Sequence, residues 1–123
     1  MGLDQFVFRA PYDENDEEAM PLLTFRKENW LNAAIETLLG EEVENCTPVE
    51  ISRAQIEELI AKISTVLKDH DQAPVLLPTQ RGFFFGGTEY DEWYFKGLHR
   101  VRYDFAHLLD GNAEASFVYY IWW

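Results

Sequence analysis

Apolar side chains recur at spacings of three and four residues in three stretches of the chain, a pattern typical of amphipathic helices. In the first stretch, Gly40 follows the last apolar position and supplies a C-terminal stop. In the second, Ser52 stands three residues before Gln55, as in a capping box. The predicted helices span about 25–39, 52–69 and 88–109. The residues expected in the core include Trp30, Ile60, either Trp93 or Tyr94, and Phe105.

Two stretches rich in aromatic and β-branched residues predict strands near the ends of the chain, over 3–8 and 117–122. Both faces of the second strand are apolar, so we expect it to be buried on both sides or to offer one face to a partner. A short extended piece is predicted at 48–51, whereas two prolines and three glycines exclude a helix between 74 and 87. The whole chain, 1–123, is therefore predicted to be a single α+β domain, with a small, mainly antiparallel sheet packed against about three helices.

The third helix is predicted to begin inside the aromatic stretch GFFFGGTEYDEWYF. Thr88 is the expected N-cap, with Glu89, Asp91 and Glu92 in the first turn, where carboxylates favour the positive end of the helix dipole. The glycine spacing fits neither a P-loop nor a dinucleotide-binding fingerprint. These acids would also compete with a bound phosphate, so capping and packing are favoured here over nucleotide binding. Residues 83–85 are expected to form a strand-like bridge into the helix.

Charge is the most informative bulk property, because the formal net charge of the 123 residues is −12. Residues 1–60 hold 14 acidic and 4 basic side chains, whereas residues 61–123 hold 8 and 6. Such a field repels nucleic-acid phosphates, so direct binding of DNA or RNA is disfavoured, whereas basic protein surfaces are attracted. Acidity that serves only solubility is the simpler alternative. The carboxylates expected to bind a partner lie in an exposed loop at about 11–21 and in a later acidic connection: Asp13, Glu14, Asp16, Glu17, Glu18, Glu41, Glu42 and Glu44.

Residues suited to catalysis or metal binding are few. Cys46 lies close to Glu44, and neighbouring negative charge disfavours a reactive thiolate, although a cysteine–histidine pair would need only to meet in space. Asp69, His70 and Asp71 are adjacent, so their side chains point in different directions, and no second histidine stands at helical spacing. We therefore expect no catalytic residues, no metal and no cofactor, and a protein that is not an enzyme.

The sequence also predicts where the protein acts. No apolar run approaches the roughly 18 residues that a membrane span requires. The N-terminal MGLDQFVFR lacks the basic start and apolar region of a signal peptide, and a single cysteine agrees with a reducing compartment. We expect a cytoplasmic protein without membrane contact.

Three segments, MGLDQFVF, FRKENW and LPTQRGFFFGGTEYDEWYF, together resemble a group of short proteins encoded by bacteriophages and prophages. The likeness covers most of the chain in order, and the third segment is its most specific part. This chain departs from the group in carrying Phe25 where a tryptophan is usual, and in the terminal strand ASFVYYIWW. The group is largely without assigned activity, so the resemblance implies a host bacterial cytoplasm as the setting and no mechanism.

In a phage setting, a small acidic protein is expected to act by binding host machinery. The first hypothesis is an inhibitor of a host nucleic-acid-targeting defence complex, of anti-CRISPR or anti-restriction type, which mimics DNA and covers a basic surface of a protein or ribonucleoprotein. The second is an accessory protein that binds a small ligand through the loop 79–92. The third is an assembly factor that uses the aromatic C-terminal strand. The residues of the alternative ligand site are Arg81, Thr88, Glu89 and Asp91.

Overall fold

A computed structural model of the chain describes residues 2–82, 87–111 and 116–123. The strands in this part of the chain are β1 (Asp4–Arg9), β2 (Leu23–Arg26), β3 (Val49–Ile51) and β4 (Phe117–Trp122). The helices are α1 (Asn29–Leu39), α2 (Arg53–Lys68), α3 (Ala73–Leu76) and α4 (Glu92–Gly111), with a short 3-10 helix at His70–Gln72. This arrangement confirms the predicted α+β class and the predicted N- and C-terminal strands.

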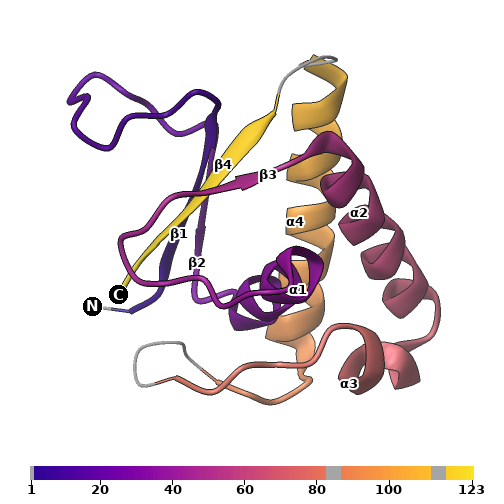
Figure 1. Cartoon of the computed structure of the whole chain (residues 1–123). Coiled ribbons are helices and arrows are strands. Elements are labelled where there is room, and N and C mark those ends of the chain that lie inside the picture. Colours follow the sequence, from indigo (N-terminus) through magenta and orange to yellow (C-terminus); the bar gives the residue numbers. More distant parts are fainter. Residues whose placement is uncertain (1, 83–86, 112–115) are drawn as a thin grey trace.

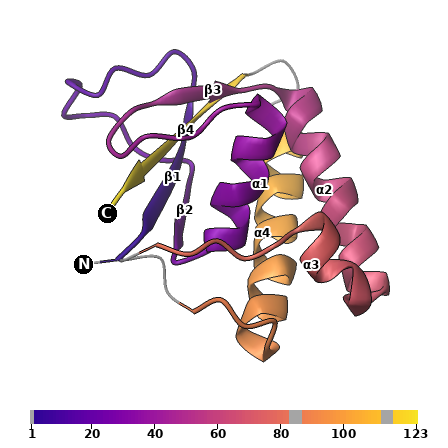
Figure 2. The same ribbon diagram turned by 60° about the horizontal axis from the view of Figure 1, so that its bottom comes forward.

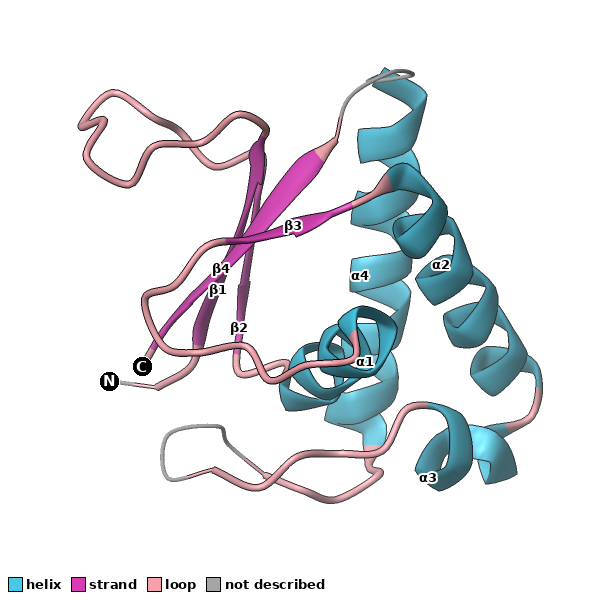
Figure 3. Ribbon diagram, in the orientation of Figure 1, coloured by secondary structure: helices cyan, strands magenta, loops and turns pink. Residues whose placement is uncertain are grey.

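The strands form one antiparallel sheet in the order β2-β1-β4-β3. The first and last strands of the chain are neighbours at its centre, paired from Asp4 with Trp122 to Arg9 with Phe117. Helices α1, α2 and α4 lie on one side of this sheet, and the loop that follows β1 projects on the other side (Figures 1 and 2). The described helices thus cover one face of the sheet and leave the other face without a helix (Figure 3).

The core lies between the helices and the covered face of the sheet. Alternation along β4 directs Phe117, Tyr119 and Ile121 into it, and all three are fully buried. Helix α4 contributes Phe105, also fully buried, and α1 contributes Trp30, which is 2% exposed. These positions, with Tyr94 at 6% exposed, confirm the expected core, whereas Ile60 is only partly buried against it and Trp93 is exposed. No described helix is both long enough and apolar enough to cross a membrane.

The sequence prediction is wrong at the start of the first helix. Phe25 belongs to β2, where it pairs with Gln5 of β1, and its ring packs 5.8 Å from that of Phe105. The helix begins only at Asn29, because Lys27 has a left-handed backbone (φ 59°) that turns the chain between strand and helix. The helical spacing over residues 25–28 is therefore overruled by pairing with a neighbouring strand.

Two further boundaries differ from the prediction. The four-residue helix α3 occupies a stretch expected to exclude helices, because Pro74 stands in its first turn, where no backbone N–H is needed. Helix α4 begins at Glu92 and not at Thr88. By contrast, the capping box of Ser52 and Gln55 is confirmed at the start of α2. The predicted bridge at 83–85 lies outside the described residues.

Candidate functional site

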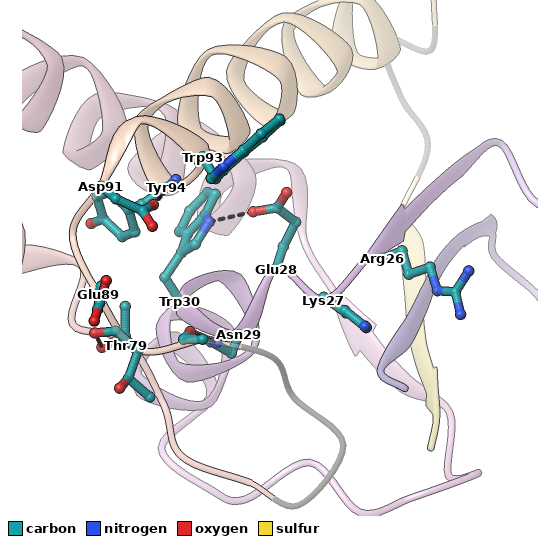
Figure 4. A pocket seen from close by; sticks show the side chains of 12 residues that line it. Arg26, Lys27, Glu28, Asn29, Trp30, Thr79, Glu89, Asp91, Trp93 and Tyr94 are labelled. Carbon is teal, nitrogen blue, oxygen red and sulfur yellow. Dashed lines mark hydrogen bonds between the residues drawn. The ribbon is translucent and has the colours of Figure 1, made fainter. Parts of the chain in front are cut away.

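A cavity of about 610 Å³ lies between the start of α1 and the segment that leads into α4 (Figure 4). Of the four residues of the alternative ligand site, Thr88, Glu89 and Asp91 line this cavity. Arg81 is exposed and is not among the lining residues. The structure thus brings three of these residues together and leaves the predicted cation apart from them.

The cap of α4 is Asp91, so the prediction that Thr88 caps this helix is wrong. The Asp91 side chain accepts a hydrogen bond from the backbone N–H of Tyr94 at 3.0 Å, and its carbonyl accepts from the N–H of Phe95 at 3.2 Å. The carbonyl of Thr88 instead accepts a hydrogen bond from the hydroxyl of Thr79 at 2.8 Å. The hydrogen bond between Thr79 and Thr88 therefore joins the two ends of the segment 79–88, and Asp91 is the N-cap of the helix.

Asn29, at the first position of α1, holds this loop against the helix. Its Nδ2 donates to the carbonyl of Gly87 at 2.7 Å, and its Oδ1 accepts from the backbone N–H of Gln80 at 3.1 Å. Asn29 is 3% exposed, while its partner Gly87 is exposed and Gln80 is half-buried, so both hydrogen bonds are partly buried. One amide side chain therefore joins both ends of the segment 80–87 to α1.

A chain of side-chain hydrogen bonds, partly buried at Gln80 and fully buried at Tyr119, continues from this point into the core. Gln80 accepts from Asn32 at 2.9 Å and donates to Glu36 at 2.6 Å. The hydroxyl of Tyr119 donates to Asn32 at 3.0 Å and accepts from Gln5 at 2.9 Å. Among the described residues no buried side-chain polar atom lacks a partner. The network thus links β1, β4, α1 and the loop after α3, which orients the walls of the cavity.

Glu28 lines the cavity with a half-buried carboxylate. Its backbone is held by the fully buried Gln5, which accepts from the Glu28 N–H at 2.9 Å and donates to the Glu28 carbonyl at 3.0 Å. Its side-chain Oε2 accepts a hydrogen bond from the indole Nε1 of Trp30 at 2.7 Å. Burial raises the pKa of Glu28, while the Trp30 hydrogen bond and the positive charge of Arg100 oppose this rise.

The carboxylate of Glu28 fits because α4 presents a glycine to it. A Cβ atom added at Gly97 would lie 2.8 Å from both Cδ and Oε1 of Glu28, closer than real Cβ contacts allow. Gly97 is buried, in the same face of α4 as Tyr94 and Val101. Glycine at this position of the helix therefore makes room for the Glu28 side chain.

The second candidate surface is the face of the sheet that no described helix covers. Tyr12 stacks on Phe8 with ring centroids 4.0 Å apart, and Tyr120 lies 6.1 Å from Tyr12 and 6.3 Å from Phe6. These four rings, Phe6, Phe8, Tyr12 and Tyr120, are called the aromatic face below. The predicted two-sided apolar character of the last strand is thus explained, because β4 contributes to the core on one side and to the aromatic face on the other.

The acidic loop at 11–21 begins at the edge of the aromatic face. Its five carboxylates are all exposed, and two of them shape the loop: Asp13 accepts from the N–H of Asn15 at 2.9 Å, and Asp16 from that of Glu18 at 3.0 Å. Burial raises the pKa of Tyr12, and the negative charges of Glu14, Asp13 and Asp16 raise it further. The loop's negative field therefore reaches the rings.

The second acidic segment, residues 41–44, reaches the aromatic face only in part. Tyr120 contacts Cys46, and the pKa of Tyr120 is raised to about 12 by burial first, then by Cys46, Tyr12 and Glu14. Cys46 is exposed, and its backbone N–H donates to the carbonyl of Ile121 on β4. This contact brings the segment that carries Glu44 to the aromatic face. Two residues expected to act with it, Glu41 and Glu42, are exposed directly after α1, and no described contact joins them to the rings.

The histidines are dispersed and do not meet Cys46 in any described contact. His70 stacks on Phe95 at 3.9 Å, and His107 packs 4.5 Å from Tyr103. No group of three His, Cys, Asp or Glu side chains among the described residues could hold a metal ion.

Sequence reasoning missed the residues that shape the cavity, chiefly Glu28, Asn29 and Trp93. The signal available was the segment FRKENW, in which Glu28 and Trp30 stand two residues apart. Their importance depends on Gly97 and Gln80, which lie far along the chain. Comparisons with protein-family models, curated proteins and solved structures find no match.

Proposed function

We propose that this chain is a phage-encoded inhibitor that binds a host nucleic-acid-targeting defence complex, of anti-CRISPR or anti-restriction type, by occupying a basic surface. The phage setting rests on the sequence resemblance. The observation that carries the binding mode is the position of the acidic loop beside the aromatic face of the sheet. Charge gathered at one surface directs that surface toward a basic partner.

The aromatic face supplies what carboxylates alone do not. Protein interfaces commonly have an apolar centre enriched in tyrosine, tryptophan and phenylalanine, with charged residues at the rim. Here Tyr12 and Tyr120 lie at the centre, and the carboxylates of the loop lie at the rim. The exposed Trp122 at the end of β4, 59% accessible, extends the same side of that strand. The partner is thus expected to place an apolar side chain within a basic surface.

Paired charge reversals on opposite sides of the molecule test this proposal. Glu14 and Glu17 are exposed and make no described hydrogen bond through their side chains, so reversing both to Lys should leave the loop intact. Glu58→Lys with Asp71→Lys is the matched control, because it changes net charge equally on the helical layer. Against a partner captured from infected host lysate, the loop pair should lower the association rate by about tenfold at low salt, and the control pair much less.

The captured partner must also meet a functional criterion. Its binding or cleavage of nucleic acid should fall when this protein is added, and excess nucleic acid should displace the protein. Rising salt should weaken the wild-type interaction by screening the loop charges. Equal effects of the two reversal pairs would show that only net charge matters, and would contradict the proposed binding surface.

The cavity beside Glu28 favours the second hypothesis, an accessory protein that binds a small ligand. Under that hypothesis the activity would tolerate reversal of Glu14, Glu17, Glu41 and Glu42 and would respond to changes in the cavity. Arg81→Ala distinguishes a ligand site in the described cavity from a site on the loop 79–92 that includes Arg81. Because Arg81 lies outside the cavity lining, the substitution should have little effect if the described cavity is the site.

A further inference from the structure

One end of the cavity combines carboxylates with aromatic rings. Figure 4 shows the Glu28 carboxylate directed toward Trp30 and lying beside Trp93, with Asp91 and Glu89 on the other side of the Trp30 ring. The ring of Trp30 meets that of Tyr94 edge-on, with centroids 6.3 Å apart. Trp93 is 70% exposed although it lines the cavity, so its ring is available to a ligand.

The positive charge of Arg100 acts on Glu28, but the ion pair that Arg100 forms is with Asp104, at 3.8 Å. None of the three ion pairs among the described residues includes Glu28, Glu89 or Asp91, and one of the three joins Arg26 to Asp4 at 3.7 Å. Arg26 and Lys27 line the cavity, but their side chains extend away from the Glu28 carboxylate (Figure 4). The ring of Trp93 already accepts one cation, because Lys96 Nζ lies 4.7 Å from its centroid.

Glu28 is also held in place before any ligand arrives. Gln5 fixes both sides of its peptide backbone, the Trp30 indole fixes one carboxylate oxygen, and Gly97 leaves the space that the carboxylate occupies. A carboxylate positioned in this way loses little conformational freedom when it binds a counter-charge. Removal from water also strengthens its attraction for a cation.

We propose that this end of the cavity binds an alkylammonium group, with Glu28 as the charge partner and the exposed ring of Trp93 against the alkyl stem and the cationic head. Carboxylates combined with aromatic faces recognise organic ammonium groups by ion pairing and cation–π contact. The group is carried either by a free amine or by a lysine side chain of a polypeptide. The proposal rests on the small-ligand hypothesis and is independent of the inhibitor activity assigned to the acidic loop.

Titration of the whole protein with n-butylammonium, followed by NMR, tests the proposal. The reporter is the indole N–H signal of Trp30, because this group donates to Glu28. n-Butanol and butyrate serve as neutral and anionic probes of similar shape at constant ionic strength. Saturable shifts of the Trp30 signal with the ammonium, and not with the other two probes, are expected.

Matched variants locate the site. Glu28→Gln keeps the side-chain shape and should weaken binding by about tenfold or more, since the charge partner is lost. Trp93→Leu should also weaken binding. Glu92→Gln and Trp122→Leu are the controls, because both residues are exposed and neither lines the cavity, so binding should change less than about twofold.

Gly97→Ala offers a second test that leaves every charge in place. The new methyl group must displace the Glu28 carboxylate, while alanine favours the helix more than glycine, so the protein should fold and bind the amine poorly. Wild-type affinity in Glu28→Gln and Gly97→Ala, or equal binding of butanol, would overturn the proposal, as would an unshifted Trp30 signal at millimolar amine.

A blocked lysine, N-acetyl-lysine-N-methylamide, distinguishes the two sources of the group. Tighter Glu28-dependent binding of the blocked lysine assigns the site to a polypeptide side chain, and tighter binding of the free amine assigns it to a small molecule. Either result supports the ammonium site. If no defence complex is captured from host lysate while the amine still binds, the inhibitor proposal is contradicted and the ammonium site stands.

Discussion

The hydroxyl of Tyr119 is the most informative atom group to remove from the core. It donates to Asn32 at 3.0 Å and accepts from Gln5 at 2.9 Å, and all three residues are at most 1% exposed. Tyr119→Phe deletes two hydrogen bonds, each with a net value of about 1 kcal/mol, and leaves the buried Asn32 oxygen without its donor, which costs about 1–3 kcal/mol more. We expect a loss of about 3 kcal/mol in the free energy of unfolding.

That loss is large for a domain whose whole stability is about 5–15 kcal/mol. Urea denaturation followed by circular dichroism should show a lower midpoint with an unchanged slope, and the thermal midpoint should fall by about 10 °C. Tyr103→Phe is the matched control, because Tyr103 is 63% exposed and its hydroxyl can bond to water. If Tyr119→Phe stays within about 0.5 kcal/mol of the wild type, the buried network does not stabilise the fold and our reasoning about it is wrong.

Two further predictions concern the cavity. Asp91→Ala should lower the free energy of unfolding by about 1 kcal/mol, because it removes the cap of α4, whereas Thr88→Ala keeps the carbonyl that Thr79 uses and should cost less; the reverse order in urea denaturation would restore Thr88 as the cap. Burial raises the pKa of Glu28 above its ordinary value of 4.5, so its contribution to stability is full below that pH and is lost as pH rises through the raised pKa. Glu28→Gln should therefore be at least as stable as the wild type at neutral pH, and a clear drop in its urea midpoint there would count against this account.

Elements defined by local spacing could be predicted from the sequence. The capping box of Ser52 and Gln55 satisfies backbone groups within a single turn, so residues three apart are enough to reveal it. The same holds for the left-handed Gly40 at the end of α1. The aromatic alternation of β4 also predicted a strand, since alternate residues of a strand face opposite sides.

Other positions were decided by contacts between distant parts of the chain. Phe25 fits a helical spacing, yet Gln5 pairs with it across β1 and β2. Thr88 and Asp91 are both residue types that commonly cap helices. In the fold, the Thr88 carbonyl accepts a hydrogen bond from the Thr79 hydroxyl, and Asp91 is the residue that caps α4. Backbone groups take whichever partner the assembled fold offers, and local spacing does not contain that information.

The sequence by itself determined the negative charge, the exposure of the acidic loop and the types of most elements, because these depend on composition and on neighbours within a few residues. Only the tertiary structure decided that β1 and β4 lie side by side, that one face of their sheet stays open beside the acidic loop, and that Gly97 leaves room for Glu28. Each of these features joins residues far apart in the chain, and their hydrogen bonds and packing exist only once both partners are in place.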